Sequence, residues 1–387
     1  MTLTSTLDRV LRRAVDGGAV AGVVAAAATD AGVVHAGARS LGQDQAMTTD
    51  TVFLIASMTK TVTTVAALQQ VERRRLHLDE PLVDVVPELA AVPVLEGFGG
   101  DGTPRLRPPA RPITLRRLLT HTAGFAYDRW NATIRRYATE RGIPDVSEGR
   151  LETLWRTPLV SDPGERWEYS SLDWVGIAVE RVCGERLSAC IRREITEPLG
   201  MTSTGFELTA EMRSRIAGRH RRLAGGDLET LPERPAGARE FDRGGGGLYS
   251  TAGDYLTFLR MLMNGGTIDG VRILRAETVA EMERNQIGDL AVTRMVSARP
   301  DLTRDVEMFP GIPKKWGLGH MITMEAVPSR RSAGSLTWAG LNNTYYWLDR
   351  ARRLAAVVCT QVLPFADPQV LKLVAAFETA LYGSLAG

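Results

Sequence analysis

Ser57 and Lys60 lie three residues apart in the segment IASMTKTV, residues 55–62. On a helix this spacing places two side chains on one face, within reach of each other. The chain has 47 Lys and Arg residues, and only four of them are Lys. Burial lowers the pKa of a Lys because it penalises the charged form, whereas Arg stays protonated in proteins. A Lys at position 60 can therefore act as a base that takes the hydroxyl proton of Ser57.

The residues around this pair are apolar. VFLIA precedes it and TVTTVAAL follows it. A helix with such flanks is buried, and an ammonium group inside a protein is costly unless it has a purpose. This disfavours the alternative of a capping Ser and a solvated Lys. We interpret Ser57 as a nucleophile and Lys60 as its general base.

Two distant segments offer groups that would complete such a site. In PGERWEYSSLDW, residues 163–174, Tyr169 follows a Pro-Gly turn, and loop residues often carry function. A phenol near an ammonium can act as a phenolate, either as a second base or as a proton relay to the leaving group. In GSLTWAG, residues 334–340, a strand edge can offer a backbone N–H to an oxyanion, together with the Ser57 N–H. Gly340 suits a close approach of the backbone.

Other hydrolytic chemistries are disfavoured. The chain has no G-x-S-x-G elbow and no H-x-x-x-H or H-E-x-x-H pair. Its three cysteines lack C-x-x-C spacing, which argues against a disulfide framework and a zinc site. We expect His121 to end a helix with a bond to the backbone, while His320 is a weaker candidate for a substrate-binding residue near the cleft. No metal or cofactor is expected.

The composition is that of an ordinary globular protein. The 387 residues are 44% hydrophobic and 24% charged, with a net charge of +2. So small a charge predicts neither a nucleic-acid partner nor a membrane surface as partner. The first residues, MTLTSTLDRVLRRAVDGG, lack the pattern of a signal peptide, so we expect a cytoplasmic protein.

The periodicity of the sequence predicts the elements that position these residues. We expect a helix over 6–16, a hairpin turning at Asp30-Ala31-Gly32, and within residues 52–76 a long, mostly apolar helix that begins near Ser57. Residues 96–112, EGFGGDGTPRLRPPARP, are predicted to be a loop. Further helices are expected over 114–124, 172–199, 209–217, 252–264 and 368–382, and strands over 318–325, 333–340, 343–349 and 353–362.

This order predicts an α/β (α+β) fold, in which both ends of the chain build one antiparallel sheet flanked by helices. Residues 1–60 and 313–387 would form this α/β lobe. Residues 61–312 would form a mostly helical lobe with loop excursions. The active-site cleft would lie between the two.

Three segments together resemble the motifs of the serine β-lactamase and penicillin-binding protein superfamily: Ser57-x-x-Lys60, Tyr169-Ser170-Ser171 and Trp338-Ala339-Gly340. The chain is more closely similar to the family VIII carboxylesterases, which share the class C β-lactamase fold. LLTHTAG (118–124) and RGGGGLYSTAGDYLTFLRML (243–262) also match recurrent stretches there. Residues 92–122 and GSLTW show a partial resemblance to the lovastatin-pathway acyltransferase.

The resemblance implies roles for individual residues. Ser57 would be acylated, Lys60 would be its base, and Tyr169 would activate the water or alcohol that deacylates it. The oxyanion hole would consist of the N–H groups of Ser57 and Leu341. Substrate would contact Trp338, Ala339, Gly340 and Ser171.

Two departures from the β-lactamase pattern bear on the substrate. Trp338 stands where β-lactamases of this fold have the Lys of Lys-Thr-Gly, and Ser171 stands where they usually have Asn. An apolar wall in place of that Lys favours an uncharged small-molecule ester over a β-lactam. We therefore predict a carboxylesterase acting on small or medium acyl chains. The alternatives are an acyltransferase, a weak β-lactamase or amidase, and a catalytically silent binding protein on the same scaffold.

Overall fold

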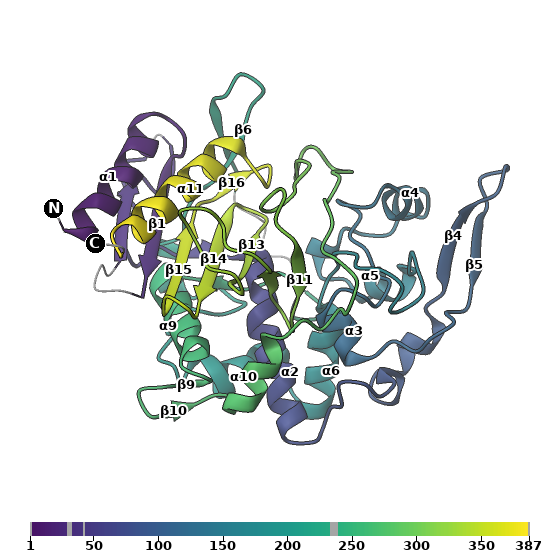
Figure 1. The fold of residues 1–387 in the computed structure, drawn as a ribbon. Helices are drawn as coiled ribbons and strands as arrows, with labels where there is room; N and C mark the ends of the chain where they lie inside the picture. Colours follow the sequence, from purple (N-terminus) through teal and green to yellow (C-terminus); the bar gives the residue numbers. More distant parts are fainter. Residues whose placement is uncertain (1, 29–32, 42, 233–238, 386–387) are drawn as a thin grey trace.

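An antiparallel sheet of seven strands forms the centre of the computed structural model, which describes residues 2–28, 33–41, 43–232 and 239–385 (Figure 1). The strand order is β11-β12-β13-β14-β15-β1-β2. The prediction that both chain ends build one antiparallel sheet is confirmed, since β1 pairs with β15 in register from Val24 opposite Cys359. The strands are β1 (Gly22–Ala27), β2 (Val33–Gly37), β11 (Lys314–Trp316), β12 (Met321–Thr323), β13 (Leu336–Gly340), β14 (Thr344–Asp349) and β15 (Leu354–Cys359).

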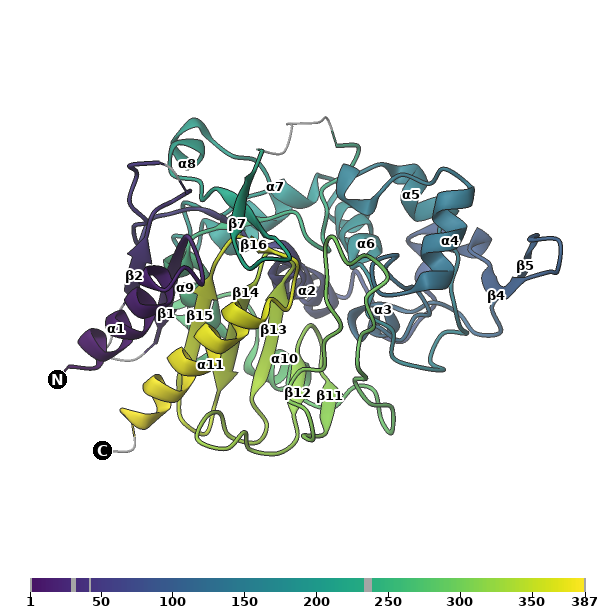
Figure 2. The same cartoon turned by 90° about the horizontal axis from the view of Figure 1, so that it is seen from above.

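Helices cover both faces of this sheet. The terminal helices α1 (Leu3–Asp16) and α11 (Pro368–Gly383) pack against each other in front of it, and α9 (Ala252–Met263) packs on β15 and β1 behind it (Figure 2). In α1, Leu7 and Leu11 are four residues apart and fully buried, so they form the stripe that faces the sheet. The predicted β1–β2 hairpin is confirmed by its pairing, while its turn at 30–32 lies outside the described residues.

Helix α2 (Thr59–Glu72) runs through the middle of the molecule (Figure 1). Every residue from Thr59 to Gln70 is buried, because α2 packs against other helices and the sheet rather than facing solvent. The range 52–76 assigned to this helix is too long: Phe53–Leu54 forms the strand β3, and the short helix η1 (Ala56–Met58) precedes α2. Pairing of β3 with Tyr249–Ser250 (β8) overrides the helical pattern there.

The remaining helices lie mostly to the α2 side of the sheet (Figure 1). The predicted helix over 172–199 is broken after Cys183, where Gly184 takes a left-handed conformation with φ 71° and caps the first segment. The helices not yet named are α3 (Leu115–Leu119), α4 (Ala132–Glu140), α5 (Leu151–Arg156), α6 (Asp173–Cys183), α7 (Leu187–Ile191), η5 (Arg192–Thr196), α8 (Ala210–Ser214), α10 (Ala276–Met282), η2 (Leu82–Asp84), η3 (Pro87–Ala91) and η4 (Val146–Glu148).

Short strands outside the main sheet include a hairpin in a segment that the sequence predicted to be a loop. The expected loop over 96–112 contains most of a hairpin of β4 (Val94–Phe98) and β5 (Pro104–Arg107), which projects from the molecule (Figure 1). Its outer part packs on little else, so its residues lack the alternation that marks a half-buried strand. The others are β6 (Arg219–Arg222), β7 (Leu228–Leu231), β9 (Thr267–Ile268), β10 (Val271–Arg272) and β16 (Val362–Leu363).

The division into a lobe of residues 1–60 with 313–387 and a lobe of 61–312 stays a prediction. Two elements of the middle segment lie with the terminal ones, since α9 packs on the sheet and β6 pairs with β16. No helix in the described part of the chain combines the length and the apolar character that crossing a membrane requires.

Candidate active site

Ser57 lies at a strained turn where β3 leads into α2. Ala56, immediately before it, has φ 44°, a left-handed conformation that a residue with a side chain adopts only at a cost of about 1–3 kcal/mol. The turn is held on both sides: the Ile55 N–H donates to Leu248 O at 3.1 Å, and the Tyr255 hydroxyl donates to Met58 O at 3.0 Å. The strained turn, held by these hydrogen bonds, therefore fixes the direction in which the Ser57 side chain points.

Lys60 is buried and surrounded by neutral hydrogen-bond partners. Its Nζ lies 3.2 Å from Ser57 Oγ, 3.0 Å from the Tyr127 hydroxyl and 2.7 Å from Gly245 O. Burial lowers the pKa of Lys60 well below its ordinary value; the carboxylate of Asp173 opposes this, and the charges of Arg129 and Arg243 add to it. A neutral amine beside a serine hydroxyl can accept its proton.

The glycine-rich segment 243–247 holds the amine in place. Gly245 accepts from Lys60 through its carbonyl, and its N–H donates to Asp173 Oδ1 at 2.7 Å. A Cβ on Gly245 would come within 2.2 Å of Ser171 Oγ, so a side chain there would push this backbone away from Lys60. This gives a structural reason for a glycine at this position.

Tyr169 lies against the same amine and is neutral. Lys60 Nζ is 4.8 Å from the centre of its ring, and Trp338 Nε1 donates to its hydroxyl at 2.8 Å. Burial, and next the neighbouring Tyr127, raise the pKa of Tyr169 far above its ordinary value, although hydrogen bonds with Ser57 and Trp338 act the other way. The expectation of a phenolate beside an ammonium is therefore not met, because burial disfavours both charged forms.

Tyr127 is a site residue that the sequence analysis missed. Its N–H donates to Tyr169 O at 3.2 Å, which brings the two rings to 5.4 Å. Burial raises the pKa of Tyr127 to about 12, with the Asp173 carboxylate adding to the effect and a Ser171 hydrogen bond opposing it. Tyr127 stands in the loop after α3, in a stretch without motif or periodicity, and only packing reveals its contact with Lys60.

The end of β13 lies close against the turn that carries Ser57. A Cβ on Gly340 would lie 2.3 Å from Ile55 O, so only glycine allows this approach. Across the described residues, the backbone N–H groups of Ser57 and Leu341 have no protein acceptor. Both residues line one small cavity of about 20 Å³, which also touches Tyr169, Trp338, Ala339 and Gly340. Two free N–H groups there can hold an oxyanion.

Ser171, Trp338 and the two histidines differ in their placement. Trp338 is buried at the small cavity, whereas Ser171 lines a separate, larger cavity beside Tyr127. His121 accepts from the Ser170 N–H at 3.3 Å and packs on the Tyr169 ring, so it bonds to backbone as expected. His320 lies in the core, where it bonds to the Tyr346 hydroxyl at 2.9 Å. It is not among the described residues that line either cavity.

Comparisons with known proteins identify the family and the fold of this chain. A family model described as Beta-lactamase matches residues 7–381. The lovastatin esterase of Penicillium rubens is 34% identical over 402 residues, covering 97% of this chain and 98% of that protein. The monacolin J acid methylbutanoyltransferase of Aspergillus terreus is 33% identical over 363 residues, covering 89% of this chain and 86% of that protein. Unliganded simvastatin synthase (LovD) from Aspergillus terreus has a TM-score of 0.82 at 30% identity, and all of both chains is covered.

These matches confirm the expected β-lactamase-like fold, as well as the resemblance to the lovastatin-pathway acyltransferase. A hydrolase with promiscuous acyltransferase activity, EstCE1, shares the fold with a TM-score of 0.77. Because the family model and the relatives span almost the whole sequence, the chain belongs to the beta-lactamase family, among its serine hydrolases and acyltransferases.

Proposed function

We propose that this protein hydrolyses uncharged carboxylic esters of small or medium acyl chains through an acyl-enzyme on Ser57. The observation that carries the proposal is the buried Lys60 amine, 3.2 Å from Ser57 Oγ and with a pKa lowered by burial. The lowered pKa favours the neutral amine, which can act as a base, whereas an Arg in its place would stay protonated.

Acylation begins when Ser57 Oγ forms a bond to the ester carbonyl carbon while Lys60 Nζ takes its proton. The carbonyl oxygen becomes an oxyanion that accepts from the N–H groups of Ser57 and Leu341. When the tetrahedral intermediate collapses, the bond to the alkoxide breaks. The alkoxide takes a proton from the Tyr169 hydroxyl, and Tyr169 is reprotonated by the Lys60 ammonium.

Deacylation repeats these steps with water as the nucleophile. Tyr169 and Lys60 together accept the water proton, and the same proton returns to Ser57 Oγ as the acid leaves. Because the pKa of Tyr169 is raised by burial, Tyr169 acts in both halves as a proton relay rather than as a stored phenolate.

The substrate class follows from the wall of the site. Trp338 fills the position at which β-lactamases of this fold have a Lys, and its indole N–H is already donated to Tyr169. The Trp338 side chain carries no charge for a substrate carboxylate, which supports a neutral ester, although Arg129 lines the same small cavity. A relative described as a lovastatin esterase, aligned over 97% of the chain, also supports ester hydrolysis.

Acyl transfer is the second candidate, and the similarity to monacolin J acid methylbutanoyltransferase favours it. Transfer and hydrolysis share the acyl-enzyme and differ in whether an alcohol or water resolves it. In both cases Tyr169 would deprotonate the incoming hydroxyl. The two activities are therefore separated by the fate of one intermediate.

The acyl-enzyme can be tested with a serine-directed phosphonate and a short p-nitrophenyl ester. We expect labelling of Ser57, located by peptide mass spectrometry, and loss of ester cleavage in Ser57→Ala. Ser384→Ala is the matched control, because among the described residues the Ser384 hydroxyl donates to a carbonyl of the preceding helix, Ala380 O. Unlabelled protein, or full activity in Ser57→Ala, would refute the proposal.

A panel of esters, amides and nitrocefin, assayed with and without an added alcohol, separates the related activities. Hydrolysis is indicated when free acid remains the main product in the presence of the alcohol. If a new ester forms at the expense of the acid, transfer is the principal activity. Faster turnover of nitrocefin than of any ester would contradict the neutral-ester assignment.

A further inference from the structure

A second cavity of about 450 Å³ shares Tyr127 with the small cavity at Ser57. It is bounded by α4, η4, α5 and the start of α6. Its volume falls within the range of about 300–1,000 Å³ of ligand pockets, and it is three times the roughly 150 Å³ of an engineered cavity that binds benzene. Its apolar lining includes Phe125, Ile134, Ala138, Ile143, Leu154 and Trp174.

The cavity has a polar end next to the reacting groups. Tyr127 lines both cavities, and its hydroxyl is bonded to Lys60 at 3.0 Å and to Ser171. Ser171 also lines the larger cavity. A ligand with its carbonyl at Ser57 could therefore extend past Tyr127 into an apolar space.

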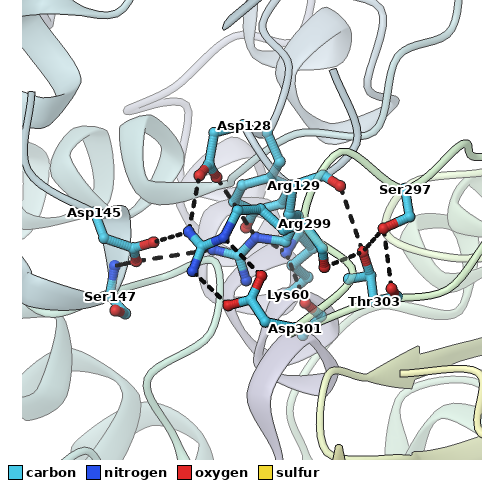
Figure 3. A network of polar contacts seen from close by, with 11 residues as sticks. Lys60, Asp128, Arg129, Asp145, Ser147, Ser297, Arg299, Asp301 and Thr303 are labelled. Carbon is cyan, nitrogen blue, oxygen red and sulfur yellow. Dashed lines mark hydrogen bonds and ion pairs between the residues drawn. The ribbon is translucent and has the colours of Figure 1, made fainter. Parts of the chain in front are cut away.

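Three carboxylates of the lining surround Arg299, and the exposed Arg135 also lines the cavity. Arg299 pairs with Asp301 at 2.8 Å, with Asp128 at 3.4 Å and with Asp145 at 3.5 Å (Figure 3). Burial raises the pKa of Asp145, but the charge of Arg129 and hydrogen bonds from Ser147 outweigh it and lower the pKa to about 2. Arg299, which is shared among three carboxylates, is therefore not available as a cation for an anionic ligand group.

We propose that this cavity binds the acyl chain of the ester, an uncharged hydrocarbon arm of medium length. This inference rests on the function proposed above. The leaving oxygen must lie near Tyr169, which protonates it, and neither Tyr169 nor Trp338 is among the described residues that line the larger cavity. The alcohol therefore leaves on the Trp338 side, and the Tyr127 side takes the acyl arm.

Filling the cavity from α4 tests the proposal. Ala138 lines it, and Ala138→Phe places a ring inside, whereas Ala132→Phe puts the same ring on an exposed position of the same helix as a control. We expect Ala138→Phe to reduce kcat/KM for p-nitrophenyl octanoate at least tenfold, because several methylenes lose their site. The value for p-nitrophenyl acetate should stay within twofold, and Ala132→Phe should change neither.

Two further arms make the result decisive. Ala138→Leu, with a smaller side chain, serves if Ala138→Phe melts earlier than Ala132→Phe; it should lower the octanoate-to-acetate ratio in the same direction. Octyl acetate and ethyl acetate, followed by pH-stat, vary the alcohol instead of the acyl chain.

An unchanged octanoate-to-acetate ratio in both Ala138 variants would overturn the cavity assignment while leaving the esterase proposal intact. Selective loss of octyl acetate cleavage would overturn the acyl assignment in favour of the alcohol. A wild-type protein that cleaves no ester and takes no phosphonate would refute the esterase proposal itself, and with it this one.

Discussion

Gly340→Ala is the substitution that most directly tests how the oxyanion would be held. The added Cβ would lie 2.3 Å from Ile55 O, about 1 Å closer than the 3.4 Å at which ordinary contact begins. Both neighbours are constrained, since Ile55 belongs to the turn before Ser57 and Gly340 pairs with Thr344 in the sheet. The end of β13 must therefore move away from Ser57 by about 1 Å, and the Leu341 N–H moves with it.

Loss of one oxyanion donor typically reduces kcat about 10²–10³-fold, equivalent to about 2.7–4 kcal/mol of transition-state stabilisation. We expect a loss in this range for Gly340→Ala on a short p-nitrophenyl ester. Overpacking should also cost about 1–3 kcal/mol of stability. Circular dichroism and a melting curve establish that the variant is folded under the assay conditions.

The matched control is Gly253→Ala in α9, where the nearest atom to the added Cβ is Thr251 Oγ1 at 3.9 Å. It should retain wild-type kcat and be no less stable. A folded Gly340→Ala protein with kcat within threefold of wild type would refute the reasoning, because the Leu341 N–H would then contribute nothing to the reaction.

Four further predictions concern the base, the tyrosines and the core. Lys60→Arg should abolish acylation, seen as loss of the p-nitrophenol burst; near-normal rates would mean that Lys60 is not a base. Burial lowers the pKa of Lys60 in the folded state, so the unfolded state binds more protons between the folded pKa and the ordinary value of 10.5. As pH rises through this window, wild type should gain stability relative to Lys60→Met. Melting curves at several pH values measure this difference. Tyr169→Phe should reduce kcat about 10²–10⁴-fold. Tyr127→Phe, which removes the hydrogen bonds with Lys60 and Ser171, should reduce kcat about tenfold or less. Equal losses would mean that Tyr169 is not the specific relay. Asp367→Asn breaks a buried ion pair with Arg222 at 2.7 Å and should destabilise the fold by about 3–5 kcal/mol in urea unfolding. The control Asp8→Asn breaks an exposed ion pair and should cost under about 1 kcal/mol. Similar values for the two variants would contradict the role of burial.

Much of the fold was predictable because the terminal segments have strong patterns. The strands at 333–340, 343–349 and 353–362 and the final helix were recognised close to their observed bounds, since buried β-branched and aromatic runs mark them. The β4–β5 hairpin was missed, because its projecting residues do not alternate between buried and exposed. Helix boundaries shifted where pairing in space, as in β3, overrode local propensity.

The sequence by itself determined that Ser57 and Lys60 are neighbours, because three residues along a helix bring two side chains together whatever the rest of the chain does. It also indicated Tyr169 and the segment 338–340, through their resemblance to known motifs. Tertiary structure alone decided the electrostatics and the shape of the site. Tyr127 reaches Lys60 across 67 positions, burial keeps Tyr169 protonated, and the larger cavity exists only where α4, α5 and α6 meet. A pKa and a cavity depend on everything packed around them, and no local pattern of residues encodes that environment.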